Sequence, residues 1–278
     1  MSHAAPPAPV GRAHGSGELA GTVVLVVGAG SSGSGVSNGE AAALTYGRAG
    51  ALVACLDRDA AEAERVAKQV VAEGGTARPV RADVTREEDV ARAVAEVTAA
   101  WGAPGVLHHN VGVAVTGDVL TLDRPTWDAS LAVNLTACYL TLRHVLPGML
   151  SAGKGAVVTV SSVAAIRDTG YVYPAYSAAK AAVDQLTVSV ALTYADRGIR
   201  ANAVLPGLID TPLAADQLVD DPAAAERALA ARHAASPTGS MGTPWEVAEV
   251  ALFLASDRAS YVNGVLLPVD GGLSARCL

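Results

Sequence analysis

The 278-residue sequence predicts a single α/β domain built on a doubly wound, seven-stranded parallel sheet. From residue 21 onward, short β-branched runs alternate with Ala-rich stretches of helical period, as expected for strands joined by crossover helices. The runs are almost continuously apolar, for example VVLVV at Val23–Val27, which is typical of strands covered on both faces. No linker rich in Pro, Ser or charge divides the chain, so one domain is expected.

The strands and helices are expected to alternate along the chain. The apolar runs predict strands at residues 22–27, 52–56, 77–81, 106–108, 156–160, 200–205 and 265–268. Stretches of helical period, with Gly or Pro near several of their ends, predict helices over residues 38–49, 59–73, 86–100, 125–150, 174–197 and 244–255. The domain is therefore expected to span residues 18–278.

Two segments fall outside this alternation. Residues 1–17 lack the charged leader and the apolar core of a secretory signal, so we expect a disordered tail on a cytoplasmic protein. Between residues 208 and 241 the chain is polar and Ala-rich beyond a strand's carboxyl end, which favours a substrate lid, with a surface helix of no role as the alternative. Tyr171 and Tyr173 are expected either to line the substrate pocket or to pack.

The composition argues against several classes of protein. A formal charge of -7, no basic tract and 4% aromatic residues argue against a nucleic-acid partner. No apolar run approaches the roughly 20 residues that span a membrane. Cys55, Cys138 and Cys277 have no paired spacing, and the acidic pair Asp220–Asp221 is interpreted as solvated charge. Neither a disulfide framework nor a metal site is expected.

A glycine-rich loop follows the first predicted strand. Gly28, Gly30 and Gly33 satisfy the G-x-G-x-x-G pattern before a helix, where backbone amides can approach a pyrophosphate. Asp57 lies at the end of the second strand, where its carboxylate can accept both hydroxyls of an adenosine ribose and repel a 2'-phosphate. Arg58 could offset part of that repulsion, and the alternative for Asp57 is an ordinary turn or cap residue. The spacing favours NAD over NADP.

A second constellation follows the fifth strand. Ser161 and Ser162 end that strand, and Tyr176 and Lys180 lie four residues apart on one face of the next helix. A phenol with a pKa near 10 is a poor base at neutral pH, but a cation about 6 Å away lowers that pKa by about two units. Lys180 together with an oxidised nicotinamide would bring the pKa of Tyr176 near neutrality. Taken alone, such a Tyr–Lys pair is usually solvated surface.

These motifs together make the chain similar to the classical short-chain dehydrogenase/reductases over residues 21–272. The resemblance implies a Rossmann-type fold and an NAD(P)-linked oxidoreductase. It is carried by the glycine loop and by Ala82-Asp83-Val84, His109-Asn110-Val111-Gly112, Val133-Asn134-Leu135, Ser162, Tyr176 with Lys180, Leu205-Pro206-Gly207, Tyr261-Val262-Asn263-Gly264 and Val269-Asp270-Gly271-Gly272.

The resemblance implies a role for each matching residue. Tyr176 is expected to be the general acid/base, Lys180 to bind the nicotinamide ribose, Ser162 to hydrogen-bond the reacting oxygen, with Ser161 as the alternative, and Asn134 to hold a water of the proton relay. The residues expected to bind the cofactor are Gly28, Ser31, Ser32, Asn38, Gly39, Asp57, Arg58, Asp83, Val84, Asn110, Val111, Gly112, Tyr176, Lys180, Pro206, Gly207, Ile209 and Thr211.

The chain departs from the family pattern in the glycine loop and in the fourth strand. The stretch from Gly28 to Gly39 is several residues longer than usual and has Ser37 where a middle glycine is expected, which indicates a subtype with an extended loop. Which of Gly30, Gly33 and Gly35 contacts the pyrophosphate stays open. His109, beside His108, replaces an Asn, and either a hydrogen-bonded strand-end role or a substrate-binding or proton-relay role is expected.

The sequence therefore predicts an NAD-dependent oxidoreductase that interconverts a secondary alcohol and a ketone. Two alternatives are a binding protein that senses NAD(H) without chemistry and a lyase or epimerase that uses tightly bound NAD. The apolar residues expected around the pocket predict a small alcohol or ketone substrate that is apolar or cyclic. The resemblance also implies a homotetramer.

Overall fold

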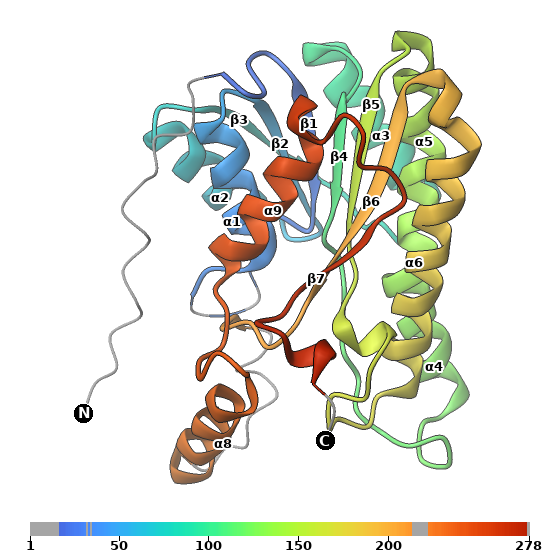
Figure 1. Cartoon of the computed structure of the whole chain (residues 1–278). Helices are drawn as coiled ribbons and strands as arrows, with labels where there is room; N and C mark the ends of the chain where they lie inside the picture. Colours follow the sequence, from blue (N-terminus) through green and yellow to red (C-terminus); the bar gives the residue numbers. More distant parts are fainter. Residues whose placement is uncertain (1–16, 32, 34, 213–221, 277–278) are drawn as a thin grey trace.

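The described residues form one sheet of seven parallel strands in the order β3-β2-β1-β4-β5-β6-β7 (Figure 1). Each strand begins and ends within one residue of its predicted bounds. They are β1 (Val23–Val27), β2 (Leu52–Asp57), β3 (Thr76–Arg81), β4 (Val106–His109), β5 (Gly155–Val160), β6 (Ile199–Pro206) and β7 (Leu266–Val269).

The structure is a computed structural model that describes residues 17–31, 33, 35–212 and 222–276. The tail predicted over residues 1–17 lies outside the described residues except for Gly17. Ser32, Cys277, the Asp220–Asp221 pair and residues 213–221 of the predicted lid also lie outside them. None of the described helices is both long and apolar enough to cross a lipid bilayer.

Helices cover both faces of the sheet, as the apolar strands predict. Alternate residues of β1 point to opposite faces, so Val24 and Val26 join one core while Val23, Leu25 and Val27 join the other. The first core packs against α1 (Asn38–Arg48), α2 (Ala60–Ala72) and α9 (Pro244–Ala255). The second packs against α3 (Glu87–Trp101), α5 (Ala137–Ala152) and α6 (Pro174–Tyr194) (Figure 1).

The helix predicted over residues 125–150 is present, and it contains a π-helical turn that the sequence analysis did not predict. The chain forms α4 (Arg124–Leu131), a π-helical turn (Ala132–Thr136) and then α5. Neither Gly nor Pro marks the turn, so the sequence pattern gives no sign of it. The turn is stabilised from outside the helix, because Asn134 Nδ2 donates to the carbonyl of Val113 at 2.9 Å. Such turns occur frequently at functional sites.

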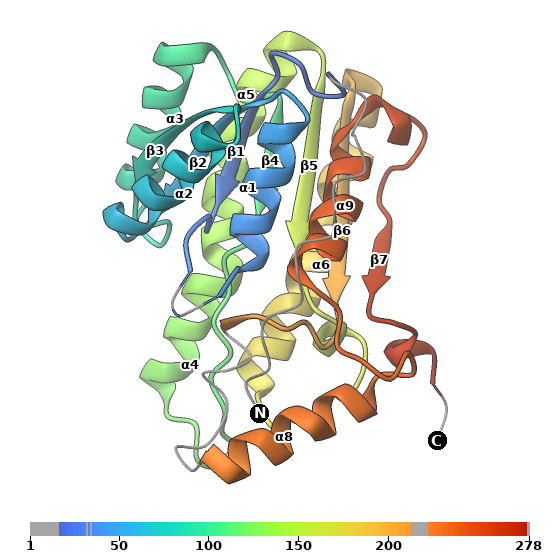
Figure 2. The same cartoon turned by 90° about the vertical axis from the view of Figure 1, so that its left-hand side faces the viewer.

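The carboxyl ends of the strands face the segment predicted as a lid. Part of that segment folds into α8 (Pro222–Ala235), which lies across this end of the molecule (Figure 2). The chain order reverses between β1 and β4, which are neighbours in the sheet. Ligands of open α/β sheets bind in the crevice at such a reversal. The fold therefore places the candidate site between the ends of β1 and β4.

Candidate active site

One cavity of about 740 Å³ opens along the carboxyl ends of the strands. Of the predicted site residues that the structure describes, all but Gly39 and Asn134 line it. The cavity wall is formed by Gly28, Ser31, Asn38, Asp57, Arg58, Asp83, Val84, Asn110, Val111, Gly112, Ser162, Tyr176, Lys180, Pro206, Gly207, Ile209 and Thr211, together with other residues. The tertiary structure thus brings together residues that lie up to 183 positions apart in the chain.

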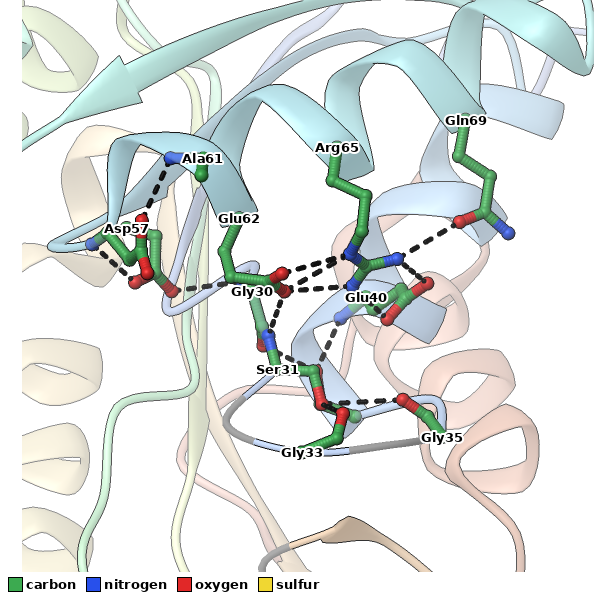
Figure 3. A network of polar contacts seen from close by, with 12 residues as sticks. Gly30, Ser31, Gly33, Gly35, Glu40, Asp57, Ala61, Glu62, Arg65 and Gln69 are labelled. Atoms are coloured by element: carbon green, nitrogen blue, oxygen red, sulfur yellow. Dashed lines mark hydrogen bonds and ion pairs between the residues drawn. The ribbon is translucent and has the colours of Figure 1, made fainter.

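Side chains hold the extended glycine loop, several residues of which line this cavity (Figure 3). The backbone amide of Gly30 donates to Asp57 Oδ2 at 2.9 Å. Ser37 is the N-cap of α1, because its hydroxyl accepts from the amide of Glu40 at 3.0 Å and donates to the carbonyl of Gly30 at 2.8 Å. Ser37 therefore replaces a glycine with a residue that fixes both the loop and the helix.

The three glycines that could contact the pyrophosphate, Gly30, Gly33 and Gly35, differ in their positions relative to the cavity. Gly30 lines the cavity, whereas neither Gly33 nor Gly35 does. Because the amide of Gly30 already donates to Asp57, the amides at the start of α1 are left to meet a phosphate. A sequence signal for this helix start was present in Ser37-x-x-Glu40, which is the pattern of a capping box.

Gly39 lets the start of α1 approach the turn after β1. A Cβ at Gly39 would lie 1.8 Å from the carbonyl oxygen of Gly28 and 2.8 Å from Asn110 Nδ2. Asn110 Nδ2 in turn donates to that carbonyl at 3.1 Å. A dinucleotide fits this arrangement, because the close approach leaves the positive end of α1 beside the cavity.

Tyr176, Ser162 and Lys180 form a group that also lines this cavity. Pro174 begins α6, so Tyr176 and Lys180 lie in its first two turns and face the cavity. The hydroxyl of Ser162 lies close enough to the phenol of Tyr176 to act to lower the pKa of that phenol. Lys180 Nζ lies 5.7 Å from the centroid of the Tyr176 ring and donates to the carbonyl of Val160 at 2.9 Å. Tyr176 and Lys180 thus lie on the same face of α6, as their four-residue spacing predicts.

The pKa of Tyr176 in the polypeptide without a cofactor is set by burial. Burial raises it to about 12, although the Ser162 hydroxyl acts in the opposite direction. Burial also lowers the pKa of Lys180, to about 8, so its amine is still mostly protonated near pH 7. Removal of the phenolate from water therefore outweighs the attraction that the spacing predicts. Additional positive charge is needed for Tyr176 to act as a base near neutral pH.

The two candidate serines have different surroundings. Ser161 is buried, and its hydroxyl donates to the backbone carbonyl of Lys180 at 3.2 Å. The hydroxyl of Ser162 accepts from the amide of Ala164 at 3.2 Å and acts to lower the pKa of Tyr176. Ser162 is therefore the serine at the phenol, whereas Ser161 fixes the backbone beneath Lys180.

Asn134 braces the wall behind Lys180. Its side chain exchanges two hydrogen bonds with Val113, donating to the carbonyl at 2.9 Å and accepting from the amide at 3.0 Å. A Cβ at Gly112 would lie 2.9 Å from Lys180 Nζ and 3.1 Å from Asn134 Oδ1. Gly112 therefore leaves room for both side chains, and Asn134 positions the segment that passes between them.

Sequence analysis missed Arg232 as a site residue. Arg232 lies on α8, is 6% exposed and lines the cavity. Its Nε donates to the hydroxyl of Tyr171 at 2.7 Å. Tyr171 stacks on Tyr173 with ring centroids 5.9 Å apart, and Tyr173 packs edge-on against Tyr176 at 5.3 Å. Helix α8 is thus connected to the ring of Tyr176 through two aromatic rings, which no local sequence pattern could indicate.

The histidine pair lies behind the cavity and does not line it. Burial lowers the pKa of His108 and of His109 to about 3, so both rings are neutral near pH 7. His108 Nδ1 hydrogen-bonds to the hydroxyl of Tyr46 at 3.0 Å. The geometry favours the strand-end role over the proton-relay role for both residues.

Asp184 gives a prediction for the pH dependence of stability. It follows Lys180 by one turn of α6, is buried, and has no hydrogen-bond partner for its carboxylate oxygens among the described residues. Burial raises its pKa from 3.8 to about 6. The folded protein thus binds this proton more tightly than the unfolded chain. The contribution of protonated Asp184 to the free energy of unfolding is therefore fully present below about pH 4 and is lost as the pH rises through about 6.

We expect Asp184→Asn to raise the melting temperature more at pH 7 than at pH 5. The upper limit of the gain is about 3 kcal/mol in the free energy of unfolding. Both pH values lie below the pKa of Lys180, so its charge changes little between them. Thermal melts of this variant and of Asp257→Asn, at an exposed position, supply the comparison. An equal gain at both pH values would contradict the assignment.

The sequence has close relatives among characterised enzymes. The family model described as "Enoyl-(Acyl carrier protein) reductase" matches residues 33–274. Cis-4-hydroxycyclohexanecarboxylate dehydrogenase of Sinomonas cyclohexanicum is 44% identical, over 78% of this chain and 85% of its own length. 2-(S)-hydroxypropyl-CoM dehydrogenase 3 of Xanthobacter autotrophicus is 38% identical, over 87% of this chain and 94% of its own length.

Solved structures show the same fold. One described as a short-chain dehydrogenase/reductase from Burkholderia xenovorans has a TM-score of 0.91 and 40% identity, over 95% of this chain and all of that one. Another is described as an NAD(P)-dependent gluconate 5-dehydrogenase from Beutenbergia cavernae with NADP at low occupancy. It has a TM-score of 0.83 and 38% identity, and the match covers 93% of this chain and 98% of that one. The chain therefore belongs to the short-chain dehydrogenase/reductase family and is a dehydrogenase of that family.

Proposed function

We propose that the protein is an NAD-dependent oxidoreductase that interconverts a secondary alcohol and a ketone, with Tyr176 as the general acid/base. The observation that carries this proposal is that Tyr176, Ser162 and Lys180 meet on one wall of the cavity whose far end holds the glycine loop and Asp57. A substrate hydroxyl at the phenol would therefore lie within the same cavity as a bound dinucleotide.

Each of the three residues Tyr176, Ser162 and Lys180 has a separate proposed role in alcohol oxidation. The phenolate oxygen of Tyr176 takes the proton of the substrate hydroxyl, and Ser162 holds the reacting oxygen through a hydrogen bond. Lys180, fixed by the carbonyls of Val160 and Val111 at 2.9 and 3.2 Å, supplies positive charge beside Tyr176. An oxidised nicotinamide, if bound in this cavity, would supply the acceptor for the hydride of the carbinol carbon and additional positive charge. In reduction, Tyr176 returns the proton.

The preference for NAD is proposed from Asp57. One carboxylate oxygen accepts from the amide of Gly30 and the other from the amide of Asp59 at 3.0 Å, so the charge is held at the loop. A 2'-phosphate beside Asp57 would meet like charge, whereas two ribose hydroxyls would meet acceptors. We expect turnover with NAD to exceed turnover with NADP by more than about tenfold.

The substrate class is proposed from the cavity and the relatives. The relatives named above oxidise a hydroxycyclohexanecarboxylate and a hydroxypropyl-CoM by name. The wall beside Tyr176 carries two further tyrosines and Met241, which suits a small carbocyclic or alkyl alcohol. We propose that the substrate is a small apolar or cyclic secondary alcohol.

For the cofactor, we propose that Asp83 and Val84 lie beside the adenine and that Pro206–Thr211 lies beside the carboxamide.

A substrate screen tests this function. Cyclic alcohols, hydroxy acids and diols are offered with NAD and, in parallel, with NADP, while absorbance of the reduced nicotinamide is followed. Growth of that absorbance with NAD is the expected result. Nucleotide binding without any absorbance change across the panel would favour a sensor, and product without net reduced nicotinamide would favour a lyase or epimerase.

We also propose that the protein is a homotetramer. Large apolar side chains are exposed on α5 and α6, where Tyr139 is 47% and Leu192 is 74% exposed. Exposed apolar side chains on neighbouring helices are typical of subunit contacts. Light scattering coupled to size-exclusion chromatography measures the mass of the assembly, and a mass of one chain would contradict this proposal.

A further inference from the structure

Two carboxylates, not one, face the glycine loop. The amide of Gly30 donates to Asp57 Oδ2 at 2.9 Å, and the next amide, of Ser31, donates to Glu62 Oε2 at 2.9 Å (Figure 3). Asp57 ends β2, whereas Glu62 lies in the first turn of α2. Both side chains line the cavity. Consecutive amides of the loop are therefore covered by two acids from different elements.

The two acids also lie close to each other. A Cβ at Gly30 would be 2.6 Å from Glu62 Cβ and 2.9 Å from Asp57 Oδ2, so both side chains approach the same point. Glycine is the residue that fits between them. A group bound at Asp57 on this side of the cavity thus meets the field of Glu62 as well.

Arg65 does not cancel this negative charge. Its guanidinium donates to both carboxylate oxygens of Glu40, at 2.7 and 2.8 Å, and to Glu62 at 3.0 Å. Glu40 is buried, with 3% of its side chain exposed. One cation is therefore shared between two carboxylates, and the Glu40–Arg65–Glu62 group keeps a net charge of -1 beside Asp57 (Figure 3).

Glu62 carries its charge at neutral pH. The hydrogen bond from Arg65 lowers the pKa of Glu62, and the amide of Ser31 acts in the same direction. The side chain is 26% exposed, so water screens its charge only in part. The same network ties α1, α2 and the extended loop together, which holds Glu62 in place when a ligand binds.

We propose that Glu62 is a second residue that selects NAD against NADP, acting beside Asp57 at the adenosine end of the cavity. This inference rests on the proposed use of NAD. A 2'-phosphate carries up to two negative charges, so each of the two carboxylates opposes it, while a free ribose hydroxyl is not opposed. Replacing Asp57 alone therefore leaves part of the selection in place.

The binding of nucleotides to Glu62→Gln, Asp57→Asn and the double variant tests the inference. Isothermal titration with NAD⁺, NADP⁺, ADP-ribose and its 2'-phosphate analogue measures affinity without any hydride transfer. Glu62→Gln keeps an acceptor for the amide of Ser31 and loses the charge. We expect it to improve NADP⁺ affinity by about tenfold and to change NAD⁺ affinity by less than about threefold. The double variant should gain more than either single variant.

Glu64→Gln is the matched control. Glu64 lies on the same helix, is exposed, pairs with Lys68 at 2.8 Å and does not line the cavity. We expect its ratio of NAD⁺ to NADP⁺ affinity to equal that of the wild-type protein. Thermal melts verify that each variant is folded before titration.

The outcomes separate this inference from the proposed function. If the wild-type protein binds NAD⁺ but Glu62→Gln leaves the ratio of the two affinities unchanged, or weakens both equally, Glu62 only braces the loop and the inference is wrong. If the folded wild-type protein binds neither dinucleotide, the proposed function itself fails. A higher NADP⁺ affinity in Glu62→Gln, absent in Glu64→Gln, supports the inference.

Discussion

Tyr176→Phe is expected to lower kcat by about 10² to 10⁴-fold, because it removes the group that accepts the substrate proton. The ring and its edge-on contact with Tyr173 are kept, so the cavity wall keeps its shape. NAD⁺ affinity is expected to stay within about threefold of the wild-type value, since the loss concerns the transition state. Steady-state kinetics with a substrate from the screen and titration with NAD⁺ measure the two quantities.

Tyr194→Phe provides the comparison for this prediction. Tyr194 ends the same helix, stacks beneath Arg197 and does not line the cavity. We expect wild-type kinetics from this variant. Full activity of Tyr176→Phe, measured beside it, would remove Tyr176 from the role of base and would reopen the question of which group moves the proton.

Gly39→Ala is expected to weaken NAD⁺ binding by about 10²-fold. The added methyl would lie 1.8 Å from the carbonyl oxygen of Gly28, so α1 must withdraw from the turn after β1. That withdrawal moves the amides at the start of the helix away from the cavity. Overpacking of this kind also costs about 1 to 3 kcal/mol of folding stability. Titration with NAD⁺ and thermal melts measure both effects.

Gly47→Ala separates the two effects. Gly47 lies in the same helix, and a Cβ there would be 2.5 Å from Val70 Cγ1, at a position that does not line the cavity. We expect lower stability with nearly wild-type NAD⁺ affinity. The ratio of lost NAD⁺ affinity to lost folding stability is compared between the two alanine variants. If that ratio were the same for both, the special role of Gly39 at the helix start would be disproved.

The sequence predicts the sheet and the ends of its strands because the relevant signals are local. A run such as Val23–Val27 is apolar on both sides, and that pattern depends only on neighbouring residues. The four-residue spacing of Tyr176 and Lys180 places both on one helical face in any helix. For the same reason, the positions of Gly28 after β1 and Asp57 after β2 indicate where a dinucleotide would place its pyrophosphate and its adenosine ribose.

Other features depend on which elements become neighbours, and no local pattern contains that information. The π-helical turn at Asn134 needs the backbone of Val113, and the contact of Arg232 with Tyr171 needs α8 to lie beside the cavity. Glu62 reaches Ser31 only because α2 packs beside the glycine loop. The chain alone determined the strands, the glycine loop and the Tyr–Lys face. The tertiary structure decided the direction of the Tyr176 pKa and the serine that meets the phenol, because burial and long-range contacts exist only once the sheet is assembled.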